Sequence, residues 1–140
     1  MTRSERNIYT GIPSQINPSQ VLALVHAGKV TSRYMNVLKS VSEIADDVIS
    51  DWLNINVKTF RTYKSKNVKI KEDLQEHTLM LLSIMKHGEE VFGDTDAFND
   101  WLETDNFFLN WQKPNIYLNT ISGIQFIDDQ LTGMEYGDNA

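Results

Sequence analysis

The sequence predicts an all-α protein, and three observations carry the prediction. Apolar residues recur at steps of three and four, which is the period of one helix face. Ser, Thr, Asn and Asp stand where helices would begin, and glycine stands where they would end. No segment alternates polar and apolar residues for long enough to require a sheet. We therefore expect seven or eight short helices in a chain of 140 residues.

The first helices follow a polar N-terminal stretch. Residues 1–18 contain one glycine and two prolines and show no apolar period, so we expect a mobile arm there. Ser19 can cap a helix that ends at Gly28. Thr31 or Ser32 can cap the next helix, which carries an apolar stripe of its own.

Further helices are expected in the second half of the chain. Residues 72–87 should form a longer helix, ended by Gly88. Asp94 or Thr95 can cap the helix that follows. Pro114 suits the first turn of another, and a last helix carries the C-terminal apolar residues.

Charge is divided unevenly between the two halves. Residues 1–71 hold 11 Lys and Arg against 5 Asp and Glu, a net charge of +6, while residues 72–140 hold 2 against 14, a net charge of −12. Such asymmetry indicates two kinds of partner, one polyanionic and one tolerant of acid. The densest cationic run, residues 57–71, contains no acid, as is typical of nucleic-acid binding. A solvated charged face would show the same composition.

Several classes of protein are excluded or disfavoured. Without cysteine there is no disulfide scaffold, and no apolar run approaches the roughly 18 residues of a membrane span. The N-terminus lacks the apolar block of a secretory signal, so we expect a cytoplasmic protein with no membrane partner. We find no nucleophile motif or phosphate loop, and His26, His77 and His87 are too far apart to share a metal. We therefore expect no enzyme activity, no cofactor and no metal site, and we interpret adjacent acids such as Asp46 and Asp47 as caps or solvated faces.

Residues 46–65 fit the spacing of a helix-turn-helix unit. Ile49 and Leu53 are four residues apart and share one face of a first helix, while Phe60 and Tyr63 are three apart and share one face of a second. A buried contact between these two faces would fix the angle between the helices.

The corner between the two helices has the residues that such a turn needs. Ser50 is small where the helices cross, and Asn54 stands where the backbone commonly becomes left-handed. Asn56 can cap the second helix by accepting from the amide of Lys58 or Thr59.

The outward positions of the second helix can all hydrogen-bond or carry charge. A recognition helix directs its N-terminal residues to base edges in the major groove, and flanking cations meet phosphates. Because one short helix reads few base pairs, we expect a homodimer on double-stranded operator DNA. Similar helix pairs also occur in proteins that bind no DNA. The DNA-binding candidates are Asn56 at the helix cap, Lys58, Thr59 and Thr62 near the bases, and Arg61, Lys64 and Lys66 near phosphates.

Residues 46–136 resemble the Xre/MbcA/ParS-type antitoxins. The matching pieces are DWLNINVKTFRTY, EEVFGD, FNDWL, Pro114 with LNTISG, and Leu131 shortly before MEYG. The resemblance implies an Xre-like helix-turn-helix module followed by a small helical toxin-binding module. It also implies a cognate toxin, usually a RES-domain enzyme that degrades NAD, and repression of the operon shared with that toxin.

The resemblance suggests boundaries and a toxin surface. The expected parts are a mobile arm (1–18), a DNA-binding module (19–71), a connecting helix (72–87) and a toxin-binding module (88–140). The glycine-rich approach to the proline is here FFLNWQKP, a departure from the family. Packing in the core is the alternative role for several candidates. The toxin-binding candidates are Pro114, Leu118, Thr120, Gly123, Leu131, Tyr136 and Gly137.

Two other functions fit the same sequence. A free-standing transcriptional regulator would share the first module but respond to something other than a toxin. A protein-interaction adaptor would keep the fold and bind no DNA, and so would show no salt-dependent DNA binding.

Overall fold

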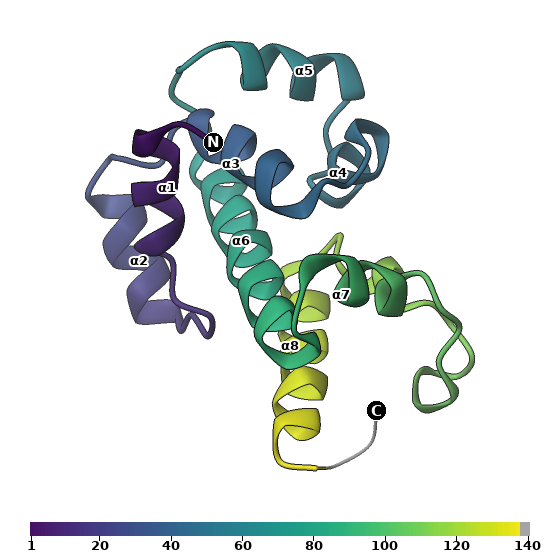
Figure 1. Ribbon diagram of the computed structural model, residues 1–140. Coiled ribbons are helices and arrows are strands. Elements are labelled where there is room, and N and C mark those ends of the chain that lie inside the picture. The colour runs from purple at the N-terminus through teal and green to yellow at the C-terminus, as the bar shows by residue number, and fades with distance from the viewer. Residues whose placement is uncertain (138–140) are drawn as a thin grey trace.

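The computed structural model describes residues 1–137 and is all-α over that range, as the sequence predicts (Figure 1). Within these residues the only β features are two isolated bridges. No helix among them is long and apolar enough to cross a membrane. The helices are α1 (Arg3–Thr10), α2 (Pro18–His26), α3 (Arg33–Ser42), α4 (Asp46–Trp52), α5 (Val57–Ser65), α6 (Glu72–Phe92), α7 (Thr95–Leu102) and α8 (Ile121–Glu135), with the 3-10 helices η1 (Phe107–Leu109) and η2 (Pro114–Tyr117).

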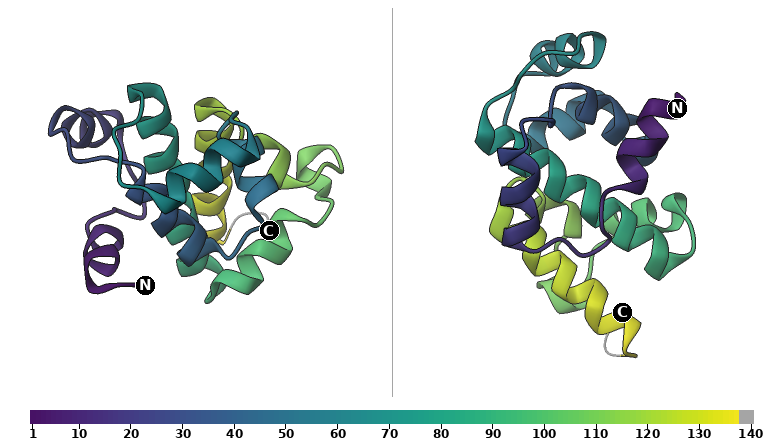
Figure 2. Two further views of the ribbon diagram at one scale, coloured as in Figure 1. Left: turned by 90° about the horizontal axis from the view of Figure 1, so that it is seen from above. Right: turned by 90° about the vertical axis from the view of Figure 1, so that its left-hand side faces the viewer.

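Helix α6 is the axis of the molecule. Helices α1 and α2 lie along one side of it, α4 and α5 lie at its N-terminal end, and α7 and α8 lie along its C-terminal half (Figures 1 and 2). Because α6 has neighbours on several sides, its middle is buried nearly all round. Leu79, Leu81 and Leu82 are fully buried there and form one continuous core with residues of the other helices.

The structure corrects the expectation of a mobile arm for residues 1–18, because they include helix α1. Thr2 and Glu5 form a reciprocal capping box, in which each side chain accepts from the other residue's amide at 3.1 Å. The buried Ile12 and a hydrogen bond from the Lys86 ammonium to its carbonyl, at 2.6 Å, attach the segment to α6. The apolar face of this helix is narrow, because only Ile8 and Tyr9 pack against the core.

Two helix boundaries also differ from the expectation. Asn17, not Ser19, caps α2 by accepting from a backbone amide. Helix α6 does not end at Gly88 but continues through Phe92, and its C-cap is Gly93, whose φ of 93° places it in the left-handed region. Gly88 lies inside the helix, where a Cβ would overlap the ring of Phe98 on α7. The glycine therefore permits close helix packing instead of marking a helix end.

Candidate functional site

Helices α4 and α5 form the predicted helix-turn-helix. Asn54 has a φ of 57°, the left-handed conformation expected at the turn. The Asn56 side chain accepts from the amide of Lys58 at 2.7 Å and so caps α5 as predicted. Ser50 is buried, and its hydroxyl donates to the backbone of the preceding turn, which leaves room for α5 to approach.

The inner faces of this pair pack as the spacing predicts. Ile49, Leu53 and Phe60 are buried, and Tyr63 is half-buried against the core. This packing turns the opposite face of α5 to solvent. Among the DNA-binding candidates, Asn56, Lys58, Arg61, Thr62 and Lys66 are exposed, while Thr59 and Lys64 are half-buried.

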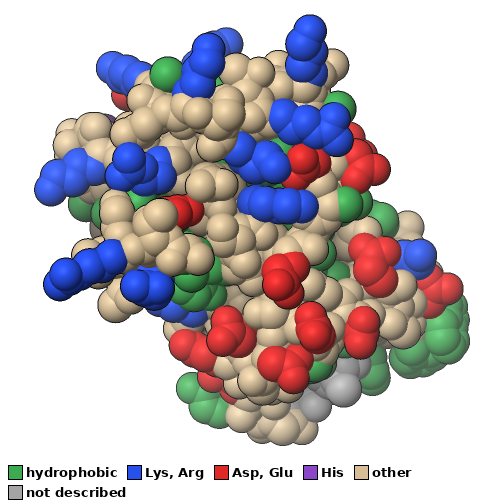
Figure 3. Space-filling view, turned by 45° about the horizontal axis from the view of Figure 1, so that its top comes forward, with side chains coloured by type: hydrophobic (Ala, Val, Ile, Leu, Met, Phe, Trp, Pro, Cys, Tyr) green, Lys and Arg blue, Asp and Glu red, His purple; other side chains and the backbone are tan. Residues whose placement is uncertain are grey.

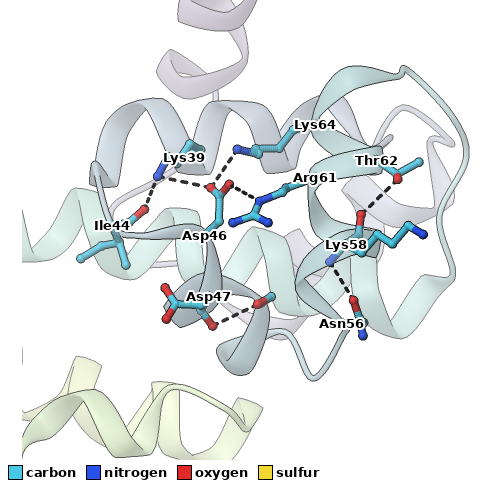
Figure 4. A network of polar contacts seen from close by, with 10 residues as sticks. Lys39, Ile44, Asp46, Asp47, Asn56, Lys58, Arg61, Thr62 and Lys64 are labelled. Carbon is cyan, nitrogen blue, oxygen red and sulfur yellow. Dashed lines mark hydrogen bonds and ion pairs between the residues drawn. The ribbon is translucent and has the colours of Figure 1, made fainter.

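Asp46 organises the cations at the base of this face (Figure 4). Its carboxylate accepts from Lys64 Nζ at 2.8 Å and Arg61 Nε at 3.1 Å, and Lys39 Nζ lies 3.3 Å away. The hydrogen bond from Lys64 is the main cause that lowers the pKa of Asp46 to about 2, against the opposing effect of burial. The sequence suggested that Asp46 is a cap or a solvated acid. Asp46 is instead the centre of an ion-pair network.

This network divides the predicted DNA-binding cations into two groups. Arg61 and Lys64 already share an anionic partner, although Arg61 keeps 63% of its side chain exposed. Lys58 extends away from Asp46 (Figure 4), and within residues 1–137 it has no acidic partner at ion-pair distance. Lys58 is therefore the cation on α5 that can bind a polyanionic ligand without first leaving an acidic partner.

The loop after α5 adds further cations, among them Lys66 and Lys69, and it is tied to the start of α3. The hydroxyl of Ser32 donates to the carbonyl of Lys66 at 2.8 Å and accepts from the amide of Val68 at 2.9 Å. An isolated bridge between Thr31 and Lys69 ties the same loop to the start of α3. Figure 3 shows Lys and Arg side chains gathered over one end of the molecule and Asp and Glu over the other. The charge asymmetry of the sequence is thus also a separation in space.

The seven toxin-binding candidates divide into buried and exposed residues. Pro114 begins η2, and it is buried together with Leu118 and Leu131. The carbonyl of Leu118 accepts from His77 Nε2 at 2.9 Å, and burial is the main cause that lowers the pKa of this histidine. These candidates therefore shape the domain from inside.

The remaining candidates lie at the two ends of α8. Thr120 caps the helix by accepting from the amide of Gly123 at 2.9 Å. A Cβ at Gly123 would overlap the carbonyl oxygen of Tyr117, so the first turn of α8 has no room for a side chain at this position. At the other end, Tyr136 is 82% exposed and is followed by Gly137 with a φ of 80°. Residues 138–140, which follow, lie outside the described residues.

Contacts that the sequence did not indicate join the helix-turn-helix to the second half. Trp52 Nε1 donates to the side-chain oxygen of Asn115 at 2.9 Å, and Asn54 Nδ2 donates to the carbonyl of Asn119 at 2.9 Å. The turn between α4 and α5 is therefore held by the segment that contains η2.

A buried histidine joins α6 to α8. His87 Nδ1 is 2.6 Å from Asp128 Oδ1, and Nε2 is paired with Glu135. Burial lowers the pKa of His87, but the hydrogen bonds to Asp128 and Glu135 outweigh that effect and raise it overall. The histidine thus fixes the C-terminal helix electrostatically, and no group among residues 1–137 has the arrangement of a metal site.

These features define a small all-α protein with a helix-turn-helix at its cationic end and a second helical unit at its acidic end. Residues 87–137 match the family model of the antitoxin Xre/MbcA/ParS C-terminal toxin-binding domain. No curated protein matches the chain. Residues 87–137 therefore form a toxin-binding domain of the Xre/MbcA/ParS antitoxin type, and this domain supports an antitoxin role in a toxin–antitoxin system.

Proposed function

We propose that this antitoxin binds and inhibits a cognate RES-type, NAD-degrading toxin and represses its own operon as a homodimer on operator DNA. The observation that carries the proposal is one chain holding both a matched toxin-binding domain and a formed helix-turn-helix with an exposed cationic face. The protein has no catalytic activity in this scheme and acts in the cytoplasm, where operator DNA is present.

The cationic end supports the DNA-binding half of the proposal. Lys58, Thr59 and Thr62 lie in the first two turns of α5, from which a helix in the major groove reaches base edges. The Asn56 side chain is used as a cap, so its contribution is to hold the helix N-terminus, whose amides favour a phosphate. Arg61, Lys64 and Lys66 contact phosphates of the DNA backbone. Arg61 and Lys64 would exchange their ion pairs with Asp46 for ion pairs with phosphate.

The acidic end supports the toxin-binding half. Tyr136 is a large exposed side chain at the end of the last helix, where a partner's cleft can receive it. Thr120 and Gly137 are exposed near the two ends of the same helix. The buried Pro114, Leu118 and Leu131, with Gly123, act by holding the helix that presents these groups.

DNA binding is tested with a fluorescent duplex from the region upstream of the chain's own gene. We expect the affinity to fall by roughly 10³ to 10⁵ between 50 and 200 mM salt, as for neutralisation of about 6 to 10 phosphates. Lys58→Ala should weaken binding, whereas the charge-matched control Lys113→Ala, in the acidic half, should not. Salt-independent or absent binding by the wild-type protein would refute the repressor role and support the adaptor.

Toxin inhibition is tested with the protein encoded next to the antitoxin gene. We expect that co-expression of the antitoxin neutralises the NAD-degrading activity of this neighbouring protein. Deletion of residues 134–140 should abolish neutralisation and leave DNA affinity unchanged. DNA binding by a protein that has no effect on the neighbouring product would instead support a free-standing regulator.

A further inference from the structure

Three aromatic side chains stand exposed in the loop between α7 and η2. Phe107, Phe108 and Trp111 are 64%, 54% and 64% exposed. Phe107 packs edge-on against both of the others, with ring centroids 5.3 Å apart in each pair. A cluster of large rings left in solvent is unusual for a single chain and marks an interaction site. We refer to residues 106–112 as the aromatic loop.

The aromatic loop is held in one shape by its own backbone. Asn106 accepts from the amide of Trp111 at 2.8 Å through its carbonyl and from the amide of Phe108 at 2.9 Å through its side chain. The amide of Asn106 donates to the carbonyl of Gln112 at 3.1 Å and closes the loop. The rings are therefore presented by a preorganised turn, which lowers the entropy lost on binding.

The same loop contains two left-handed residues that are not glycine. Asn110 has a φ of 62° and Trp111 a φ of 63°. This conformation is common for asparagine but strained for a bulky aromatic residue. Strain of this kind persists where surrounding structure enforces it, and it gathers at functional sites. Here it directs an indole ring away from the core and into solvent.

The charge around the aromatic loop indicates the chemistry of the partner. Asp100 and Glu103 are exposed on and just after α7, and Asp105 is exposed directly before the loop. Lys113 is an exposed cation directly after the loop, so these neighbours remain acidic on balance. Figure 3 shows an apolar patch at the edge of the acidic end of the molecule. A second copy of this chain docked patch to patch would bring like charges together, which opposes association. A partner with an apolar pocket rimmed by Lys and Arg fits instead.

We propose that the aromatic loop is a docking anchor for the cognate toxin, with Trp111 and Phe107 entering an apolar pocket that basic side chains surround. The inference rests on the proposed toxin-binding function, and it places a contact site well before the C-terminal Tyr136. The loop lies inside residues 87–137, the part of the chain matched to a toxin-binding domain. Exposed aromatic residues at the centre of an interface contribute most of the binding energy in many complexes.

The test measures the affinity of the purified toxin, the product of the adjoining gene, for antitoxin variants. Trp111→Ala should weaken binding by about 30-fold or more, the effect of losing an interface hot spot. Leu22→Ala is the matched control, because Leu22 is 47% exposed on α2 at the opposite side of α6, and it should stay within about twofold of wild type. Circular dichroism and DNA affinity of both variants should equal those of the wild type, which excludes misfolding.

Three results would overturn the proposal, and each is distinguishable. If the Trp111→Ala variant binds the toxin as tightly as the Leu22→Ala variant does, the docking role is refuted and the toxin-binding function is left intact. Failure of the wild-type protein to bind the toxin would refute the proposed function itself. If sedimentation shows that Trp111→Ala converts a wild-type dimer to a monomer, the occupant is a second copy of this chain.

Discussion

The ion-pair network at Asp46 makes a quantitative prediction for Asp46→Asn. Folding lowers the pKa of this carboxyl from 3.8 to about 2. At about 1.4 kcal/mol for each pKa unit, the shift corresponds to roughly 2 to 3 kcal/mol of stability at neutral pH. Part of this comes from Arg61, which is 63% exposed and therefore screened by solvent. We expect the variant to lose about 1 to 2 kcal/mol of unfolding free energy at pH 7.

The dependence of this difference on pH follows from the sign of the shift. Because the folded state has the lower pKa, the stabilisation by Asp46 is complete above about pH 4 and is lost as the pH falls toward 2. Urea unfolding of both proteins, followed by circular dichroism between pH 7 and pH 3, should show the gap narrowing at the acid end. The exposed neighbour Asp47 provides the matched control Asp47→Asn.

The same variant separates two roles for the cations. Removing Asp46 leaves Arg61 and Lys64 available to phosphate, so Asp46→Asn should bind promoter DNA several-fold more tightly than Asp47→Asn, which has the same net charge. Equal stability of the two variants at pH 7, or a stability gap that persists unchanged at pH 3, would refute the account of this network.

Three further predictions concern packing, the buried histidine and the turn. Gly123→Ala should destabilise the protein by roughly 1 to 3 kcal/mol or prevent folding, because the new methyl group overlaps the carbonyl of Tyr117; thermal unfolding measures this. Folding raises the pKa of His87. The wild-type protein should therefore be more stable than His87→Gln by the largest margin below about pH 6.5, and this margin should decline as the pH rises above that value. A margin that grows with pH would contradict this prediction. Asn54→Ala should lower the free energy of unfolding by about 1 to 2 kcal/mol, because it adds backbone strain and removes a hydrogen bond. Asn54→Gly should lower it less, because glycine relieves the strain at this position; chemical denaturation measures both variants.

The helix-turn-helix was predictable because its signals are local. A left-handed turn at Asn54, a cap at Asn56 and the buried faces of Ile49 and Phe60 depend on spacing within a few residues, and each prediction was confirmed. The apolar face of α8 was predictable for the same reason.

Features that depend on long-range contact were missed. Nothing near Gly88 in the sequence shows that Phe98 will lie against it, so the glycine was interpreted as a helix end. The partners of Asp46 come from α3 and α5, and sequence spacing alone does not bring them together. The mobile-arm prediction failed because α1 is only eight residues long and packs only Ile8 and Tyr9 on the core, which is too short a pattern to show an apolar period. Thr2 and Glu5 nevertheless have the spacing of a capping box.

The central claim is that separate ends of one chain bind DNA and the toxin. A gel-shift assay with promoter DNA, antitoxin and added toxin tests it directly with Lys58→Ala and Trp111→Ala. We expect Lys58→Ala to bind toxin without shifting DNA, and Trp111→Ala to shift DNA without the further shift that toxin produces with wild type. Loss of both interactions in both variants would contradict two separate surfaces.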